Sequence, residues 1–341
     1  SAIDIYNQES MRDWIGFMPA RFTSRRVARA MAKRAYEQAR RYASPADAVF
    51  GLGSTATIAT DRAKRGDHRV AAAVHDAFGI ATYSLTIEKD ARDRPGEEDI
   101  VSLLLLRAVA DACGVLARPD LPLTGSERVE IELFPSELIA GVERGERTMA
   151  VIRSDGTVVS TPVRGAEDRW VVLSGAFNPA HEGHLELARA AAEHMGLPAL
   201  FELPIVNADK APIGMFEARL RAQQFAGRGA LALTRAPLFV EKAALFPGSV
   251  FVLGLDTAER ILEPRFYNGS EEQMRAALHG IAAHGCRFLV AGRLGEGEEY
   301  KTLRHLPVPE DMRGLFEELP EGSFRRDVSS TEIRAGWGER G

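Results

Sequence analysis

The chain has very little cysteine, and this scarcity limits its chemistry. Among 341 residues there are only two cysteines, Cys113 and Cys286, which excludes a framework of several disulfides and a four-cysteine zinc site. Both cysteines lie among apolar residues, which predicts buried, reduced thiols and a cytoplasmic location.

Long apolar runs and a strong net charge are also missing. No stretch approaches the roughly eighteen apolar residues of a membrane-spanning helix, so we expect no membrane partner. Ser1–Asp4 shows neither a basic leader nor an apolar core, which predicts no signal peptide. The formal net charge of −5 provides no global basic field, which argues against nucleic acid as a partner. The length suits two globular domains.

The densest group of polar and conformationally special residues follows one apolar run. Trp170–Leu173 predicts a buried strand, and Leu185–Met195 has the spacing of a helix. The segment between them, Ser174–His184, therefore lies on a strand–loop–helix junction, where backbone N–H groups and a helix N-terminus suit an anionic ligand. His181 and His184 are three residues apart, so both imidazoles would face the same phosphate oxygens.

Two segments resemble the signatures of a known family. Gly175–His184 (GAFNPAHEGH) resembles the GxFxPxHxGH signature of the HIGH-type nucleotidyltransferases. Val328–Arg334 (VSSTEIR) resembles the ISSTxIR signature of their adenylyl-transferring branch. The resemblance covers residues 170–341. Strands and helices alternate across this region, which predicts an α/β fold with a doubly wound parallel, Rossmann-like sheet.

Several polar residues of this region directly follow predicted strands, and ligands of parallel sheets bind beyond the carboxyl ends of the strands. These segments resemble the nicotinamide or nicotinate mononucleotide adenylyltransferases. The residues that the resemblance assigns to mononucleotide binding are Asn178, Asn207, Lys210, Arg219, Asp256 and Arg293.

The resemblance implies attack of a mononucleotide 5′-phosphate on the α-phosphorus of ATP, with release of pyrophosphate. The nucleophile is already an anion, so catalysis depends on positioning and charge stabilisation. Mg²⁺ would bridge phosphate oxygens, and no dedicated protein metal site is expected. The implied catalytic residues are His181, His184, Lys210 and Arg334. The implied ATP-binding residues are Gly175, Ala176, Phe177, His181, His184, Ser329, Ser330, Thr331 and Arg334.

Residues 1–118 predict a separate α/β domain. Helices and strands are expected at 23–43, 70–74, 81–87 and 97–113. Gly51–Thr57, rich in Gly, Ser and Thr, is interpreted as a loop that either cradles phosphate or makes a tight turn. The layout resembles the C-terminal domain of the CinA family, which includes nicotinamide-nucleotide amidases. The family's Glu-Ser-Cys-Thr-Gly-Gly and Gly-Pro-Gly segments are absent, so the resemblance implies a scaffold or a homo-oligomer interface.

Residues 119–169 predict a small β connector between the two domains, because Asp155-Gly156 separates two apolar runs as in a hairpin. Three alternatives to the mononucleotide reaction stay open. The acceptor could be another phosphate compound such as phosphopantetheine. The chain could be a nucleotide-binding regulatory or scaffold protein. The N-terminal half could retain amidase activity.

Overall fold

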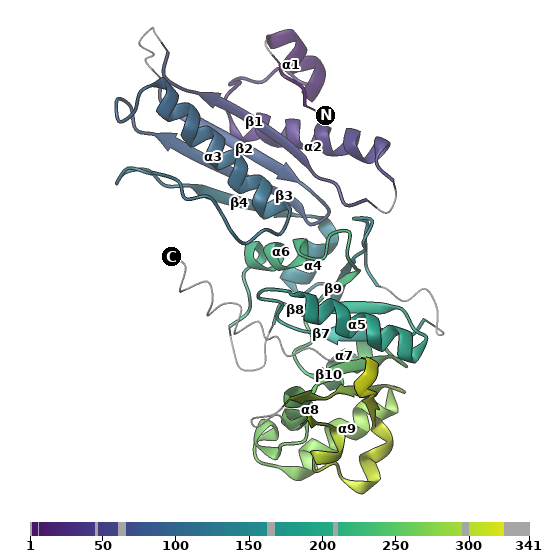
Figure 1. Ribbon diagram of the computed structural model, residues 1–341. Coiled ribbons are helices and arrows are strands. Elements are labelled where there is room, and N and C mark those ends of the chain that lie inside the picture. The colour runs from purple at the N-terminus through teal and green to yellow at the C-terminus, as the bar shows by residue number, and fades with distance from the viewer. Residues whose placement is uncertain are drawn as a thin grey trace. The chain divides into compact units, whose positions relative to one another are not determined.

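The chain divides into two compact units. The first contains residues 1–140, 152–158 and 215–228, and the second contains residues 141–151, 159–214 and 229–341. The computed structural model describes residues 2–5, 7–44, 47–60, 66–161, 168–206, 211–294 and 300–323. Figure 1 draws these residues as coloured ribbon.

The first unit is built on an antiparallel sheet in the order β1-β2-β3-β4. Its strands are β1 (Gly51–Thr57), β2 (His68–His75), β3 (Gly79–Ile87) and β4 (Glu130–Pro135). Its helices are α1 (Gln8–Ile15), α2 (Arg25–Tyr42), α3 (Arg94–Ala112) and α6 (Met215–Gln223). The four helices and strands predicted at 23–43, 70–74, 81–87 and 97–113 are confirmed.

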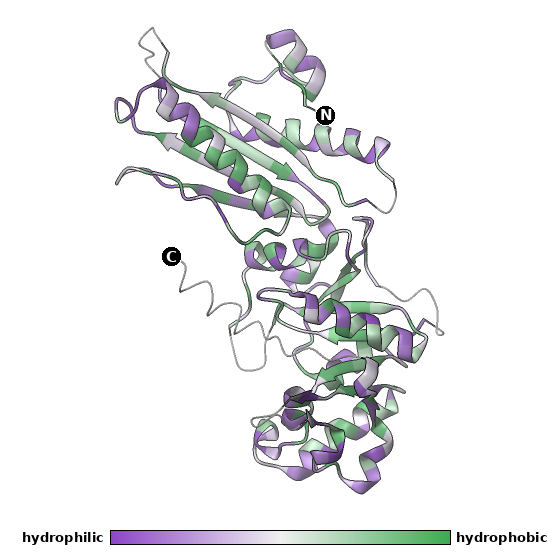
Figure 2. Cartoon of the chain, viewed as in Figure 1, coloured by the Kyte–Doolittle hydropathy of each residue, from purple (hydrophilic) through white to green (hydrophobic). Residues whose placement is uncertain are grey.

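Alternating side chains along β2 explain why a helix packs on each face of this sheet. Val70 and Val74 lie in the apolar core with residues of α3, whereas Ala71 and Ala73 pack against alanines of α2. The unit therefore has three layers, with α2 and α3 on opposite faces of the strands (Figure 1). Figure 2 shows α3 and the central strands as mostly hydrophobic.

The prediction of a loop at Gly51–Thr57 is wrong, because these residues form β1. Their glycines serve helix packing. A Cβ atom on Gly51 would lie 2.2 Å from the backbone oxygen of Ala32, and one on Gly53 would lie 2.4 Å from that of Ala28. The glycines thus let α2 approach the strand more closely than any side chain would allow.

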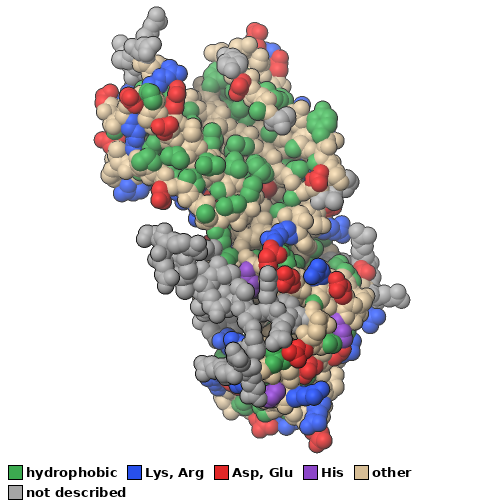
Figure 3. Space-filling model, viewed as in Figure 1, with side chains coloured by type: hydrophobic (Ala, Val, Ile, Leu, Met, Phe, Trp, Pro, Cys, Tyr) green, Lys and Arg blue, Asp and Glu red, His purple; other side chains and the backbone are tan. Residues whose placement is uncertain are grey.

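The prediction that both cysteines are buried is half right. Cys286 is 1% exposed and its thiol lies 3.2 Å from the backbone oxygen of Phe246. Cys113 is exposed at the C-cap of α3. Helix α3 exposes apolar as well as polar side chains, and its Leu106 is 55% exposed, so apolar neighbours in the sequence do not ensure burial there. Figure 3 shows apolar side chains exposed over this part of the first unit.

The residues expected to form a separate β connector instead add strands to the sheets of the two units. Strand β4 pairs with β3 in the first unit. Strands β5 (Met149–Ile152) and β6 (Val158–Val159) lie at one edge of the second unit's sheet. The expected turn is present, since Gly156 adopts a φ of +77° and its N–H donates to Arg153. Edge pairing explains the difference, because existing sheets offer these short strands backbone partners.

The second unit is built on an eight-stranded sheet in the order β14-β11-β10-β7-β8-β9-β5-β6. Its other strands are β7 (Val171–Ser174), β8 (Ala199–Pro204), β9 (Leu231–Thr234), β10 (Val250–Gly254), β11 (Arg287–Ala291) and β14 (Phe316–Leu319). A separate hairpin joins β12 (Arg293–Leu294) and β13 (Tyr300–Lys301).

Helices alternate with these strands. They are α5 (Glu182–Met195), α7 (Phe239–Leu245), α8 (Leu255–Ile261) and α9 (Glu271–Ala283). Helix α4 (Glu137–Arg144) begins in the first unit and ends in the second. Short 3-10 turns span Pro264–Tyr267, Leu303–His305, Glu310–Leu315 and Glu321–Ser323. No helix among the described residues is both long and apolar enough to cross a membrane.

The order of the parallel strands is that of a Rossmann-like fold. Strand β7 pairs in parallel with β8 on one side and with β10 on the other, and β9, β11 and β14 extend the sheet outward. This arrangement places the first three parallel strands on one side of the reversal and the last three on the other. For the described residues between 170 and 323, the predicted parallel sheet and strand–helix alternation are confirmed, whereas β14 was not predicted. The resemblance to CinA in the first unit stays a prediction.

Candidate functional site

The predicted phosphate-binding loop lies at the reversal point of the second unit's sheet. It links β7 to α5, and β7 is the strand from which the chain proceeds first to β8 on one side and later to β10 on the other. Connections leave such a point toward opposite faces of the sheet, so ligands of this fold class bind there. The loop is therefore where this architecture favours a nucleotide.

Gly175 and Phe177 shape the loop. The N–H of Gly175 donates to the backbone oxygen of Glu202 at 3.0 Å. A Cβ atom on Gly175 would lie 2.9 Å from the ring of Phe177, so glycine leaves room for that ring to fold inward. Phe177 adopts a φ of +46° and is 2% exposed. Its buried ring leaves the backbone as the part that can face a ligand, while Ala176 is exposed and Asn178 half-buried.

Phe177 also supports the second of the two histidines. Its ring packs edge-on against His184 with centroids 5.2 Å apart, and against Phe201 of β8 at 5.9 Å. The rings of His181 and His184 stack with centroids 3.7 Å apart. The structure thus brings the predicted residues Gly175, Phe177, His181 and His184 into one cluster.

The two histidines are joined by reciprocal contacts at the start of α5. His181 is the N-cap residue, and its N–H donates to Nδ1 of His184 at 3.2 Å. The backbone N–H of His184 donates in turn to the backbone oxygen of His181 at 2.9 Å. An Nδ1 atom that accepts a hydrogen bond leaves the ring proton of a neutral imidazole on Nε2. His184 therefore presents Nε2–H as a donor beside a helix N-terminus.

The charge state of His184 supports this role. Burial, with a smaller contribution from His181, lowers the pKa of His184 from 6.5 to about 4. The imidazole is neutral near pH 7 and so keeps its Nδ1 acceptor and its Nε2–H donor together. The neutral Nε2–H group can donate a hydrogen bond to a phosphate oxygen, and the amino end of the 14-residue helix attracts the negative charge of that oxygen.

Two further predicted residues lie at the next strand ends. Asp256 is in the first turn of α8, directly after β10, and Arg293 follows β11. Arg293 donates from Nη1 to Oδ2 of Asp256, and both side chains are more than half exposed. Because β7, β10 and β11 are adjacent and parallel, these residues lie at the same edge of the sheet as the histidine loop.

The structure also shows a buried charged group beneath the loop that the sequence analysis missed. Glu202 of β8 is 0% exposed and contacts Nζ of Lys242 at 2.6 Å, as well as the hydroxyls of Ser174 and Thr234. Ser174 immediately precedes the loop, so this network fixes the point at which the loop leaves β7. A glutamate inside the apolar run of β8 was the signal available in the sequence.

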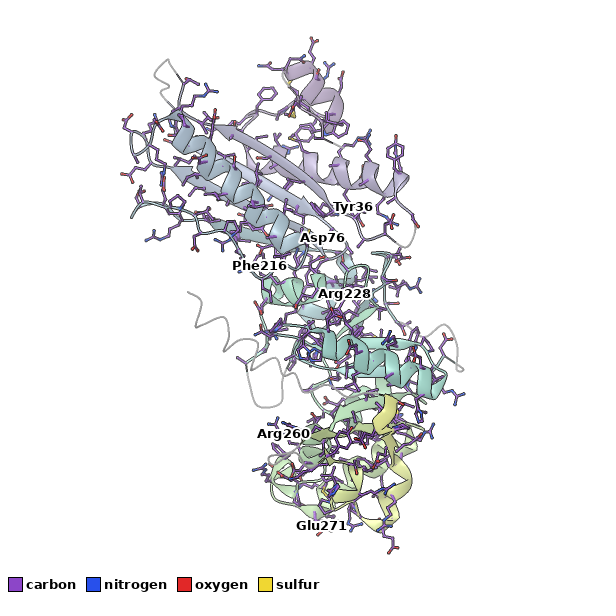
Figure 4. All side chains as sticks on the ribbon, in the orientation of Figure 1. Tyr36, Asp76, Phe216, Arg228, Arg260 and Glu271 are labelled. Carbon is purple, nitrogen blue, oxygen red and sulfur yellow. The ribbon has the colours of Figure 1, made fainter. Side chains whose placement is uncertain are left out.

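Arg219 lies elsewhere. It belongs to α6 in the first unit, is 0% exposed and is ion-paired with Asp76 at the end of β2. Figure 4 labels Asp76 and Phe216, the latter also on α6 and packed edge-on against Tyr83. The structure therefore shows a buried structural pair at Arg219, and its role in mononucleotide binding stays a prediction.

The remaining predicted site residues lie outside the described residues, and their roles stay predictions. They are Asn207, Lys210, Ser329, Ser330, Thr331 and Arg334. The described residues contain no group of three or more His, Cys, Asp or Glu side chains arranged to hold a metal ion.

Sequence comparison finds similarity to adenylyltransferases. The chain is 28% identical over 194 residues to a probable nicotinate-nucleotide adenylyltransferase of Gloeobacter violaceus, a match that covers 50% of this chain and 87% of the relative. It is 27% and 28% identical over 142 residues to proteins of the same description from Trichormus variabilis and a Nostoc species. These two matches cover 37% of this chain and 62% of each relative.

No family model matches the chain. The partial similarity, at 27–28% identity, supports a relation to the HIGH-type nucleotidyltransferases at most. It agrees with the Rossmann-like strand order and with the loop that carries the two histidines.

Proposed function

We propose that the second unit transfers an adenylyl group from ATP to the 5′-phosphate of nicotinate mononucleotide, as a step in NAD biosynthesis. The observation that supports this most is His184, a neutral histidine whose Nε2–H group lies at the start of α5, where the strand order reverses. The descriptions of three relatives favour nicotinate over nicotinamide as the acceptor.

The proposed step needs charge stabilisation more than proton transfer. An oxygen of the mononucleotide phosphate attacks the α-phosphorus of ATP, and the bond from that phosphorus to the β-phosphate oxygen breaks, so pyrophosphate leaves. Two anions must approach each other, and donors fixed in advance favour that approach. His181 and His184 would contact the α- and β-phosphates.

The other predicted residues complete this proposal. Ser329, Ser330, Thr331 and Arg334 would hold the β- and γ-phosphates, and Lys210 would neutralise phosphate charge. Asp256, with Asn178, Asn207 and Arg293, would contact the mononucleotide. Mg²⁺ bound with ATP would withdraw charge from the phosphorus under attack.

The proposal is tested with the purified chain, ATP, Mg²⁺ and one acceptor at a time. We expect pyrophosphate and dinucleotide with nicotinate mononucleotide, and less or none with nicotinamide mononucleotide or phosphopantetheine. If phosphopantetheine were the one acceptor that gave turnover, nicotinate mononucleotide would be wrong as the proposed acceptor. A lack of pyrophosphate with every acceptor would contradict adenylyl transfer itself.

The His184→Ala substitution tests the site residue. Loss of one fixed donor to a developing charge lowers kcat by about 100- to 1,000-fold, while the fold, measured by circular dichroism, is retained. The matched control is His194→Ala, in the last turn of the same helix, where the ring contacts Glu317 at 3.0 Å. That exposed pair contributes at most about 1 kcal/mol to stability, so the control keeps its turnover.

A further inference from the structure

A groove in the first unit is lined by an unusual number of arginines. It has a volume of about 610 Å³ and lies at the amino end of α2. Its charged lining consists of one glutamate, Glu130, and five arginines, which are Arg21, Arg25, Arg26, Arg69 and Arg128. We call it the arginine groove. All of its lining residues belong to the first unit, so it is separate from the site proposed for adenylyl transfer.

The groove lies where α2 begins, on the sheet face that this helix covers. The helix begins at Arg25, with Ser24 as its N-cap. Beyond that point the face that α2 covers elsewhere is no longer apolar. Ser84, Thr86 and Arg69 alternate there with the buried residues that pack toward α3. Polar side chains on an uncovered sheet face, next to free amide groups of a helix N-terminus, form a polar depression.

The charges of the groove are only partly balanced. Arg25 is ion-paired with Glu130 and Glu132. Arg21 and Arg128 have no carboxylate partner among the described residues, and Arg128 donates to the backbone oxygen of Glu127 at 2.6 Å. Several guanidinium groups around one depression repel each other unless an anion lies between them. The groove thus has more positive charge than the described part of the chain neutralises.

We propose that the arginine groove binds a small molecule that carries two or more phosphate groups. Guanidinium groups pair with phosphate oxygens through two parallel hydrogen bonds, and hydroxyls and helix amides add further donors. The volume is that of a small-molecule site. The described lining contains no aromatic ring on which bases could stack, which favours a small polyphosphate over a single-stranded nucleic acid.

The test uses the full chain and tripolyphosphate, with calorimetry for affinity and hydrogen exchange for location. Tripolyphosphate should slow exchange of the amides at residues 21–27 and 126–130. The double variant Arg21→Gln, Arg128→Gln should bind at this place at least about tenfold more weakly, because two charge-assisted hydrogen bonds are lost. The matched control Lys33→Gln, Arg41→Gln removes two charges from the exposed middle and end of α2 and should bind like the parent chain.

His184→Ala distinguishes the two sites. It should lower the turnover proposed for the second unit by the same factor of about 100 to 1,000 and leave protection of residues 21–27 unchanged, so that failure of one proposal can be told from failure of the other. Equal affinity of the groove variant and its control, or protection confined to the second unit, would overturn the groove proposal. Tighter binding of a single-stranded oligonucleotide than of tripolyphosphate at residues 21–27 would overturn the assignment to a small ligand.

Discussion

The two units place their polar side chains by different rules. In the second unit, parallel strands end at one edge, and the loop after β7, Asp256 after β10 and Arg293 after β11 lie along that edge. In the first unit, antiparallel strands end alternately at both edges, so consecutive segments do not converge. Its arginine groove is formed instead by segments far apart in the sequence, at 21–26, 69–71, 84–86 and 126–130.

The difference concerns predictability as well as geometry. In a parallel sheet with crossover helices, every strand ends at the same edge, so a residue that directly follows a strand in the sequence lies at the edge where ligands bind. An antiparallel sheet has no such rule, so the same residue types at strand ends carry no information about a shared site. Polar residues after strands are therefore stronger signals in the second unit than in the first.

Each unit contains a buried pair of a basic and an acidic side chain beside its sheet, Lys242–Glu202 in the second unit and Arg219–Asp76 in the first, and breaking these pairs should have the largest effect on stability. Lys242→Met would leave the carboxylate of Glu202 buried without a cation beside it. Arg219→Met would do the same to the carboxylate of Asp76. We expect each to lower the free energy of unfolding by about 3–5 kcal/mol. Hydrogen exchange should show the loss in the second unit for Lys242→Met and in the first unit for Arg219→Met.

Neutral double variants are the controls for these pairs. Lys242→Met with Glu202→Gln, and Arg219→Met with Asp76→Asn, remove both charges and should recover much of the lost stability. The second double variant also tests the predicted role of Arg219. Turnover that stays low in a stable Arg219→Met, Asp76→Asn chain would favour a role in mononucleotide binding over a structural one.

Stability should depend on pH through the histidine loop of the second unit. The unfolded chain protonates this histidine as the pH falls through about 6.5, whereas folded His184 protonates only near pH 4. The folded state is therefore fully favoured above pH 6.5 and loses roughly 3 kcal/mol as the pH falls toward 4. Urea unfolding of the parent chain and of His184→Gln between pH 6.5 and about 4 measures this loss of stability. Parallel pH curves for the two proteins would contradict the lowered pKa.

The smallest effect is expected at the close contact between α2 and β1 in the first unit. Gly53→Ala puts a methyl group 2.4 Å from the backbone oxygen of Ala28, so the helix must shift, at a cost of about 1–3 kcal/mol. Gly125→Ala is the matched control, because a methyl group there meets no atom within 4 Å. Equal unfolding midpoints in urea for the two variants would show that α2 moves aside freely.

Much of the fold could be predicted from local pattern. Apolar runs such as Trp170–Leu173 and the helical spacing of 23–43 depend on neighbours in the chain, and the structure confirms both as a strand and a helix. Gly51–Thr57 was mispredicted as a loop because glycine favours turns. Here it allows a helix from another part of the sequence to approach, which no local pattern reveals.

For the candidate site, the sequence by itself determined the residue types and their order, with two histidines three residues apart in a glycine-containing loop after a buried strand. Only the tertiary structure decided that His184 is neutral and supported by Phe177, that Glu202 and Lys242 anchor the loop, and that Arg219 lies buried in the other unit. The physical reason is that burial, pKa and ion pairing depend on partners distant in the chain. Helical and strand periodicity depend only on neighbours.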